Sequence, residues 1–162
     1  MALVFYTIET RLLRQATEQQ LEGGIKPVVL LEISSKDREL GAAVNLTTFH
    51  LKNIGSGPAF NVRVAPIVGD GVRLDIGEIP LIESDDTKSF YPDVAQDGER
   101  NGMSMRPALL AHLICQGKFP YKMPVTVECR GLSGKPYRTC HELRYDPREQ
   151  RVWTDFVRLE NG

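Results

Sequence analysis

The chain has 162 residues, three cysteines and a formal net charge of -1. This length fits one compact domain with a core of its own. Hydrophobic residues make up 41% of the chain and charged residues 25%, which is typical of a globular rather than a disordered chain. No run of basic residues is present, so the sequence has no polybasic arm and does not indicate nucleic acid as a partner.

Residues 1–24 have the pattern of an amphipathic helix that ends at two glycines. Its apolar positions recur at spacings of three and four and share one face; they are Phe5, Ile8, Leu12 and Ala16. The strands that follow can cover one another without this helix. We therefore expect its apolar face to bind a protein partner or a second copy of the chain.

A second interpretation places the same helix at a membrane. The apolar run at 2–6 is far shorter than the roughly 20 residues that cross a bilayer. Its aromatic end, followed by Arg11 and Arg14, is nevertheless typical of the cytoplasmic end of a membrane anchor. Both interpretations stay open at this point.

From Pro27 onward, short runs rich in Val, Ile, Thr and aromatic residues alternate with Gly, Pro, Asn and Asp, as in strands and turns. We predict strands at 27–34, 42–53, 59–68, 72–76 and 87–91, and three more that begin at Pro124, Pro136 and Arg151. Seven or eight short strands without a long helix between them predict a mainly β domain over 25–162, an antiparallel immunoglobulin-like β-sandwich preceded by the N-terminal α-helix.

The alternation of apolar residues along these strands predicts the core. We expect the following side chains to be buried between two sheets: Val44, Leu46, Phe60, Val62, Val64, Val125, Val127 and either Trp153 or Phe156. The polar segment at 92–105 is predicted to be a loop. The apolar segment that follows, from Arg106 to about residue 116, has the spacing of a short helix, with a buried strand as the alternative.

The segment "NIGSGPAFNV", at 53–62, resembles a phosphate-binding loop at first sight. It fails that pattern because Asn61 replaces the third glycine, Pro58 has no N–H to donate, and a strand rather than a helix follows. We predict a turn between two strands, with Gly55 free to take a positive φ.

The pattern N-x-G-x-G-P-A-x-N-V resembles bacterial immunoglobulin-like sandwich domains, including CARDB-like modules. The order of "RLLRQATEQQLEGGIKPVVLLE", "LKNIGSGPAFNVRV" and "VECRGLSGKPYRTCHELRYD" is similar to that in a loosely defined group of bacterial membrane-anchored proteins. The resemblance implies a fold and a membrane or partner attachment. It implies no catalytic residue and no cofactor.

The cysteines are odd in number and widely spaced, which indicates free thiols in a reducing compartment. We therefore expect a cytoplasmic protein, at the cytoplasmic face of the inner membrane if the helix is an anchor. Cys115 and Cys129 are expected in the core as small apolar residues. Zinc ligands are usually paired about two to four residues apart, and these cysteines are not, so we expect no metal.

No sequence motif of a known catalytic site is present. Cys140 and His141 are neighbours in a predicted strand and point to opposite faces, so we expect His141 at the surface and without a catalytic role. The sequence thus predicts a non-catalytic interaction or adaptor domain without cofactors. The alternative is a small hydrolase whose histidine and nucleophile come from distant loops.

Overall fold

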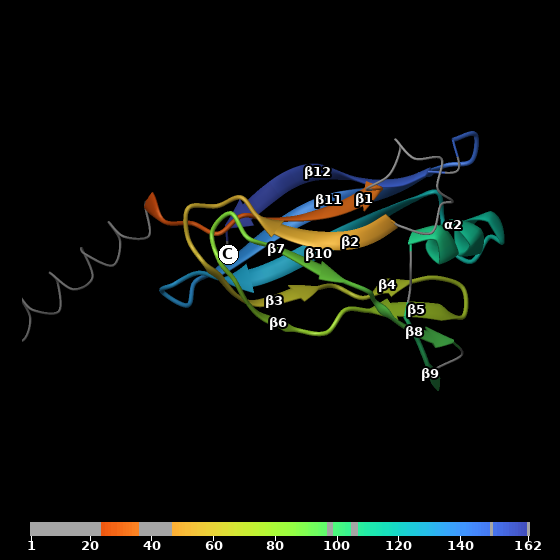
Figure 1. Cartoon of the computed structure of the whole chain (residues 1–162), viewed down its shortest axis with the longest axis horizontal. Helices are drawn as coiled ribbons and strands as arrows, with labels where there is room; N and C mark the ends of the chain where they lie inside the picture. The colour runs from red at the N-terminus through yellow and green to blue at the C-terminus, as the bar shows by residue number, and fades with distance from the viewer. Residues whose placement is uncertain (1–23, 36–46, 97–98, 105–106, 150, 162) are drawn as a thin grey trace, which may run out of the picture.

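A computed structural model describes residues 24–35, 47–96, 99–104, 107–149 and 151–161. Within these ranges the chain forms strands and one helix (Figure 1). In chain order they are β1 (Val29–Ser35), β2 (Thr47–Asn53), β3 (Ala59–Val64), β4 (Ile67–Val68), β5 (Val72–Asp75), β6 (Ile79–Ile82), β7 (Thr87–Phe90), β8 (Asp93–Gln96), β9 (Glu99–Ser104), α2 (Pro107–Cys115), β10 (Lys122–Arg130), β11 (Pro136–Asp146) and β12 (Arg151–Asn161). The predicted mainly β architecture is confirmed.

The strands form three antiparallel sheets. A three-stranded sheet has the order β1-β2-β7, a five-stranded sheet β12-β11-β10-β3-β6, and a four-stranded sheet β4-β5-β8-β9. In Figure 1 the three-stranded sheet lies across the five-stranded sheet, and the four-stranded sheet lies at one end, below α2. Buried apolar side chains of all three sheets and of α2 form one cluster, which is the core.

Polar side chains join β1 to the five-stranded sheet. The Thr139 hydroxyl donates to the Val29 carbonyl at 2.5 Å, and the Thr154 hydroxyl donates to the Leu31 carbonyl at 2.6 Å. The Leu31 N–H donates to Nε2 of His141 at 3.4 Å. These bonds pair backbone groups on the side of β1 that faces away from β2, so this edge of the strand is closed by side chains instead of another strand.

Most predicted strands are confirmed, with shifted ends. Residues 42–46 of the second predicted strand lie outside the described residues. The third predicted strand is interrupted at Ala65 and Pro66, because proline has no N–H for a sheet ladder, and it becomes β3 and β4. The short helix predicted from Arg106 is confirmed as α2.

The loop predicted at 92–105 is wrong, because β8 and β9 form a hairpin there. β8 pairs with β5, and Val94 opposite Leu74 is buried in the core. One buried apolar side chain and a neighbouring strand are enough to hold an otherwise polar segment in the sheet.

The predicted core is right at four positions: Val62, Val64, Val125 and Val127 are buried. Val44 and Leu46 lie outside the described residues. The prediction that Phe60 is buried in the core is wrong. Asn61, with a φ of 50°, forms a bulge against β10, and Ala59 points inward instead.

The prediction that either Trp153 or Phe156 is buried in the core is wrong, because neither residue is. Trp153 pairs with Arg144 on the opposite face and is half-buried. Phe156 faces β1 and stacks edge-on against His141, but it lies on an edge strand and is 49% exposed. Val152 takes the buried position at this end of β12.

Among the described residues, no helix has the length and apolar composition needed to cross a membrane. The predicted helix at 1–24 and its partner-binding residues Phe5, Ile8, Leu12 and Ala16 lie outside the described residues, apart from Gly24.

Candidate functional site

The turn after β2 holds the chain segment that leads into the domain. Ser56 Oγ donates to the Gly24 carbonyl at 2.7 Å and accepts from the Lys26 N–H at 3.2 Å. The Ile54 N–H donates to the Val28 carbonyl at 2.9 Å. Residues 24–28 are therefore fixed against residues 53–57, and we call these two segments together the N-terminal clasp.

Asn53 is the centre of the N-terminal clasp and is completely buried. Its Oδ1 accepts from the N–H groups of Val28 at 3.2 Å and Gly55 at 3.0 Å. Its Nδ2 donates to the carbonyls of Gly57 at 2.8 Å and Ile82 at 3.1 Å. The amide has two donors and two acceptor positions, so one side chain meets its full capacity while joining three segments of the chain.

The glycines of the turn are required for close approach. A Cβ on Gly55 would lie 2.2 Å from the Lys26 carbonyl oxygen, and a Cβ on Gly57 would lie 2.5 Å from Ile25. The predicted positive φ at Gly55 is wrong, since positive φ among the described glycines occurs at Gly71, Gly117 and Gly134. The turn itself is confirmed.

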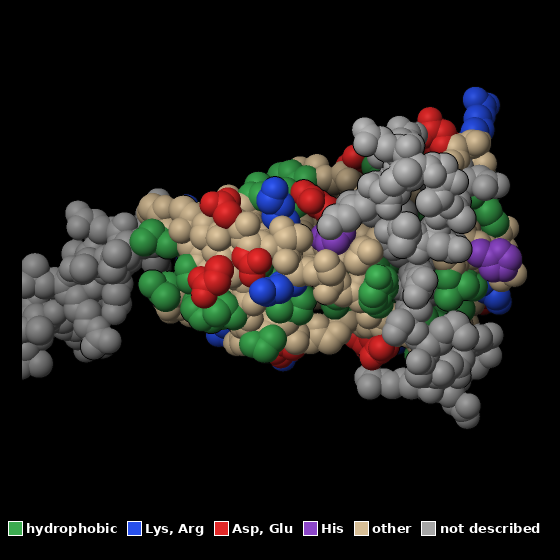
Figure 2. Space-filling model, in the orientation of Figure 1, with side chains coloured by type: hydrophobic (Ala, Val, Ile, Leu, Met, Phe, Trp, Pro, Cys, Tyr) green, Lys and Arg blue, Asp and Glu red, His purple; other side chains and the backbone are tan. Residues whose placement is uncertain are grey.

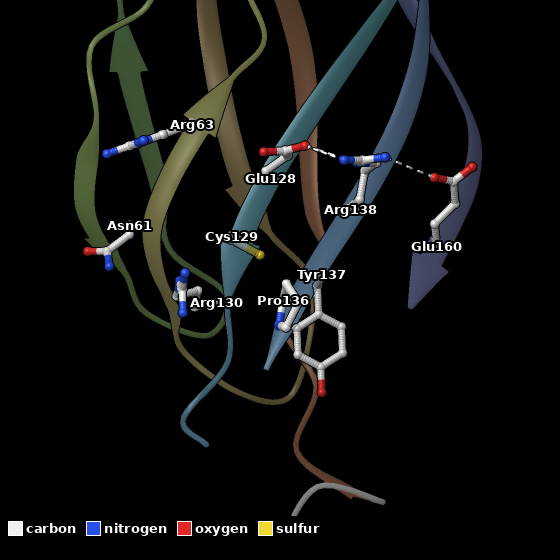
Figure 3. Close-up of a pocket in the computed structure, with 9 residues that line it drawn as sticks. All are labelled: Asn61, Arg63, Glu128, Cys129, Arg130, Pro136, Tyr137, Arg138 and Glu160. Atoms are coloured by element: carbon white, nitrogen blue, oxygen red, sulfur yellow. Dashed lines mark hydrogen bonds and ion pairs between the residues drawn. The ribbon is translucent and has the colours of Figure 1, made fainter. Parts of the chain in front are cut away.

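The outer face of the five-stranded sheet carries a hollow of about 550 Å³ (Figure 3). Its lining side chains come from β3, β10, β11 and β12; they are Asn61, Arg63, Glu128, Cys129, Arg130, Pro136, Tyr137, Arg138 and Glu160. The mixture of three arginines and two glutamates indicates a polar contact surface.

Arg138 organises the charges in this hollow. Its guanidinium donates to Glu128 at 2.6 Å and lies 3.8 Å from Glu160, so it stands between two carboxylates (Figure 3). These carboxylates, with Glu128 the stronger influence, raise the pKa of Arg138. Arg63 pairs in the same way with Glu78. Because Arg63, Glu78, Glu128 and Arg138 are exposed and Glu160 is half-buried, the ion pairs can exchange for contacts with a partner.

Cys129 gives the hollow no nucleophile. Its side chain is buried, and burial raises the pKa of the thiol to about 11. The thiol therefore stays protonated near neutral pH. Its predicted core position is confirmed, and all three cysteines are free.

Cys115 is exposed, so the prediction that it lies in the core is wrong. It is the last residue of α2 and follows the buried Ile114. Its thiol lies 3.0 Å from the Tyr145 hydroxyl, and this contact, together with burial, raises the pKa of Tyr145 to about 12. A second hollow, of about 540 Å³, lies beside them between Asp70 and Tyr121.

His141 is buried, with 2% of its surface exposed, so its predicted surface position is wrong. The alternation along β11 is regular, but its phase places Thr139, His141 and Leu143 inward and Cys140 outward. Nε2 faces Leu31 and Thr139, whereas Nδ1 has no hydrogen-bond partner among the described residues. Desolvation lowers the pKa of His141, so the ring stays neutral.

One histidine lies next to a hydroxyl group at the surface. Nδ1 of His50 is 3.0 Å from Oγ of Ser89, and Glu32 lies opposite His50 on β1. These residues form a row across three strands. Neither of the two hollows described above is lined by these residues.

Neither a metal site nor a similarity to known proteins identifies the function of this domain. The described part of the chain contains no group of three or more His, Cys, Asp or Glu side chains placed to hold a metal ion. No family model, curated protein or solved structure matches this chain. The resemblance to CARDB-like domains therefore stays a prediction.

Proposed function

We propose that the chain is a non-catalytic interaction domain of a bacterial protein, with an immunoglobulin-like β-sandwich that is attached to a protein partner or membrane by residues 1–23. The observation that carries this proposal is the N-terminal clasp. Backbone and side-chain hydrogen bonds fix residues 24–28 against the turn after β2, so the proposed attachment joins the domain at a firmly held segment. A rigid joint of this kind suits a domain that must present its surface in one orientation.

Exposed apolar side chains at the same end support a contact there. Ile54, in the clasp, is 49% exposed, and Leu132, in the turn between β10 and β11, is 64% exposed. Figure 2 shows hydrophobic side chains at this end of the described domain. They extend the contact surface expected from Phe5, Ile8, Leu12 and Ala16. The charged hollow of Figure 3 offers polar contacts on a second face.

Removal of residues 1–23 tests this proposal. The cut keeps Gly24 and Ile25, because the clasp binds both. We expect the truncated chain to keep a cooperative thermal transition but to lose binding in liposome flotation, or that part of its self-association in light scattering that depends on residues 1–23. In the full chain, Leu12→Glu should have the same effect, whereas Gln15→Glu, off the apolar face, should not. A full chain that neither associates nor binds lipid would refute the attachment.

A second candidate function rests on the row of Glu32, His50 and Ser89. A histidine within hydrogen-bond reach of a serine is the minimum arrangement for a hydrolase nucleophile. We expect no reaction with a fluorophosphonate probe, because neither of the two described hollows gives this row a substrate pocket. Labelling that is lost in Ser89→Ala, and retained in Ser84→Ala, would favour the hydrolase instead.

A further inference from the structure

β12 is the longest strand at the edge of any sheet among the described residues. It has 11 residues and pairs on one side with β11. The other edge strands have two to seven residues, and the longest of them, β1, has its free side closed by Thr139, His141 and Thr154. A long edge presents N–H and C=O groups that can pair with another strand.

Apolar side chains are concentrated on this edge. Phe156 is 49%, Val157 57% and Leu159 37% exposed, which makes three of the eight exposed large hydrophobic residues in the described part of the chain. Figure 2 shows hydrophobic side chains over β12 along the upper margin of the domain. Three exposed apolar side chains within four positions form a patch, whereas single exposed apolar residues are scattered over most surfaces. Such a patch indicates a contact surface.

A β-bulge in the middle of β12 places Asp155 and Arg158 on the same face of the sheet. Asp155 lies opposite Glu142 and Arg158 lies opposite Cys140, so Val157 is the extra residue. Glu142 and Cys140 are two positions apart on β11 and share a face. Asp155 and Arg158 therefore also share a face, although they are three positions apart.

We propose that β12 pairs antiparallel with β12 of a second copy, around a two-fold axis that passes between Phe156 and Val157. In this register Asp155 lies opposite Arg158 of the second copy, and Phe156 lies opposite Val157 of the second copy. Each contact occurs twice, as a two-fold interface requires. The apolar side chains that are exposed on one chain then cover one another at the axis.

Charge complementarity is what selects a second copy as the partner. Within each chain Asp155 already lies 3.2 Å from Arg144, and Arg158 lies 2.7 Å from Glu160. Pairing of the strands joins these into a continuous row of alternating charges across the axis, which is stronger than isolated surface pairs. A strand from another protein would need the same order of charges by coincidence.

Charge reversal tests this interface in the full chain. We expect the parent protein to be dimeric by light scattering. Arg158→Glu places two carboxylates opposite each other, and Asp155→Arg places two guanidinium groups opposite each other, twice in each dimer. Each variant alone should raise the dimer dissociation constant by about tenfold or more. An equimolar mixture should dimerise again, because each variant then meets its complement.

Native mass spectrometry distinguishes this interface from the N-terminal helix, since the two variants differ in mass. Pairing through β12 gives mainly heterodimers, whereas association through residues 1–23 gives a statistical mixture of both homodimers and the heterodimer. Arg73→Glu, an exposed change on β5, should leave the dimer unchanged. A monomeric parent protein at all soluble concentrations, unaltered dimerisation of either variant, or failure of the mixture to recover would overturn the proposal.

Discussion

Asn53 shows how much of this fold depends on one buried amide. It is the last residue of β2, and its side chain bonds the entering segment, its own turn and β6. Its backbone also accepts from the Asp85 N–H and donates to the Asp86 carbonyl. An apolar residue here would leave buried backbone groups without partners, which is unfavourable even when the shape fits.

We predict that Asn53→Ala lowers the free energy of unfolding by about 2–4 kcal/mol, because several buried backbone groups lose their partner together. Ser56→Ala removes exposed bonds of the same clasp and should lower it by less than about 1 kcal/mol. Urea denaturation measures both. Equal effects of the two changes would show that Asn53 does not have this central role.

His141 makes stability depend on pH. Burial lowers its pKa in the folded protein, whereas the unfolded chain keeps the ordinary value of about 6.5. The unfolded state therefore binds the proton first as pH falls. We predict that the free energy of unfolding is insensitive to His141 above about pH 7 and decreases as pH falls below about 6.5.

The control for this pH dependence is a second histidine. His141→Gln should flatten the decrease between about pH 5 and 7, relative to the parent protein, because the titrating ring is gone. His112→Gln replaces a histidine on the exposed side of α2 and is the matched control substitution. Denaturation at several pH values in this range measures the free energy of unfolding of each protein. The same pH dependence in all three proteins would contradict the role of His141.

The turn between β2 and β3 acts as a unit with the segment that it holds. Gly55 and Gly57 allow its backbone to lie directly against residues 25–28, while Gly77 has open space around the position of a Cβ. We predict that Gly55→Ala lowers the free energy of unfolding by about 1–3 kcal/mol through overpacking, and that Gly77→Ala changes it by less than about 1 kcal/mol. Matched thermal and urea melts test the pair.

Strands with strong local signals could be predicted from the sequence. The hairpins around residues 131–135 and 147–150 follow from Gly, Pro and Asp between alternating runs, and α2 follows from its helical spacing. β8 and β9 could not be predicted in this way, because pairing of β8 with β5 and of β9 with β8, rather than their own composition, holds them in the sheet. The bulge at Asn61 reversed the phase at Phe60 for a similar reason, since it depends on β10.

Both the closed edge of β1 and the N-terminal clasp depend on contacts between residues that are far apart in the sequence. Thr139 and Val29 are separated by 110 positions, and Thr154 and Leu31 by 123, so spacing in the chain gives no sign of either bond. The segment at 53–62 could be predicted as a turn from its sequence. Its hydrogen bonds to residues 24–28 could not, because they depend on the folded structure. Thr139 and His141 are polar residues in phase with the apolar Tyr137 and Leu143 on β11, and this pattern is the signal that could have indicated the closure of β1.

The molecule as a whole should therefore fail to fold without its last strand. We predict that a chain ending at Asp146, which lacks β12, shows no cooperative thermal transition, because β1 loses the Thr154 bond and β11 loses its neighbour. A chain that lacks only residues 161 and 162 should melt like the parent protein. A cooperative melt of the shorter chain would show that β12 is dispensable.

The closed edge of β1 also sets an order for synthesis on the ribosome. β1 emerges among the first strands of the domain, but the hydroxyl and imidazole groups that complete its backbone pairing belong to β11 and β12. Until those residues leave the exit tunnel, β1 can pair with β2 alone and keeps unpaired carbonyl groups. The β-domain thus stays incomplete until β12 has been synthesised, and before that point its exposed backbone groups and apolar side chains favour binding of a chaperone.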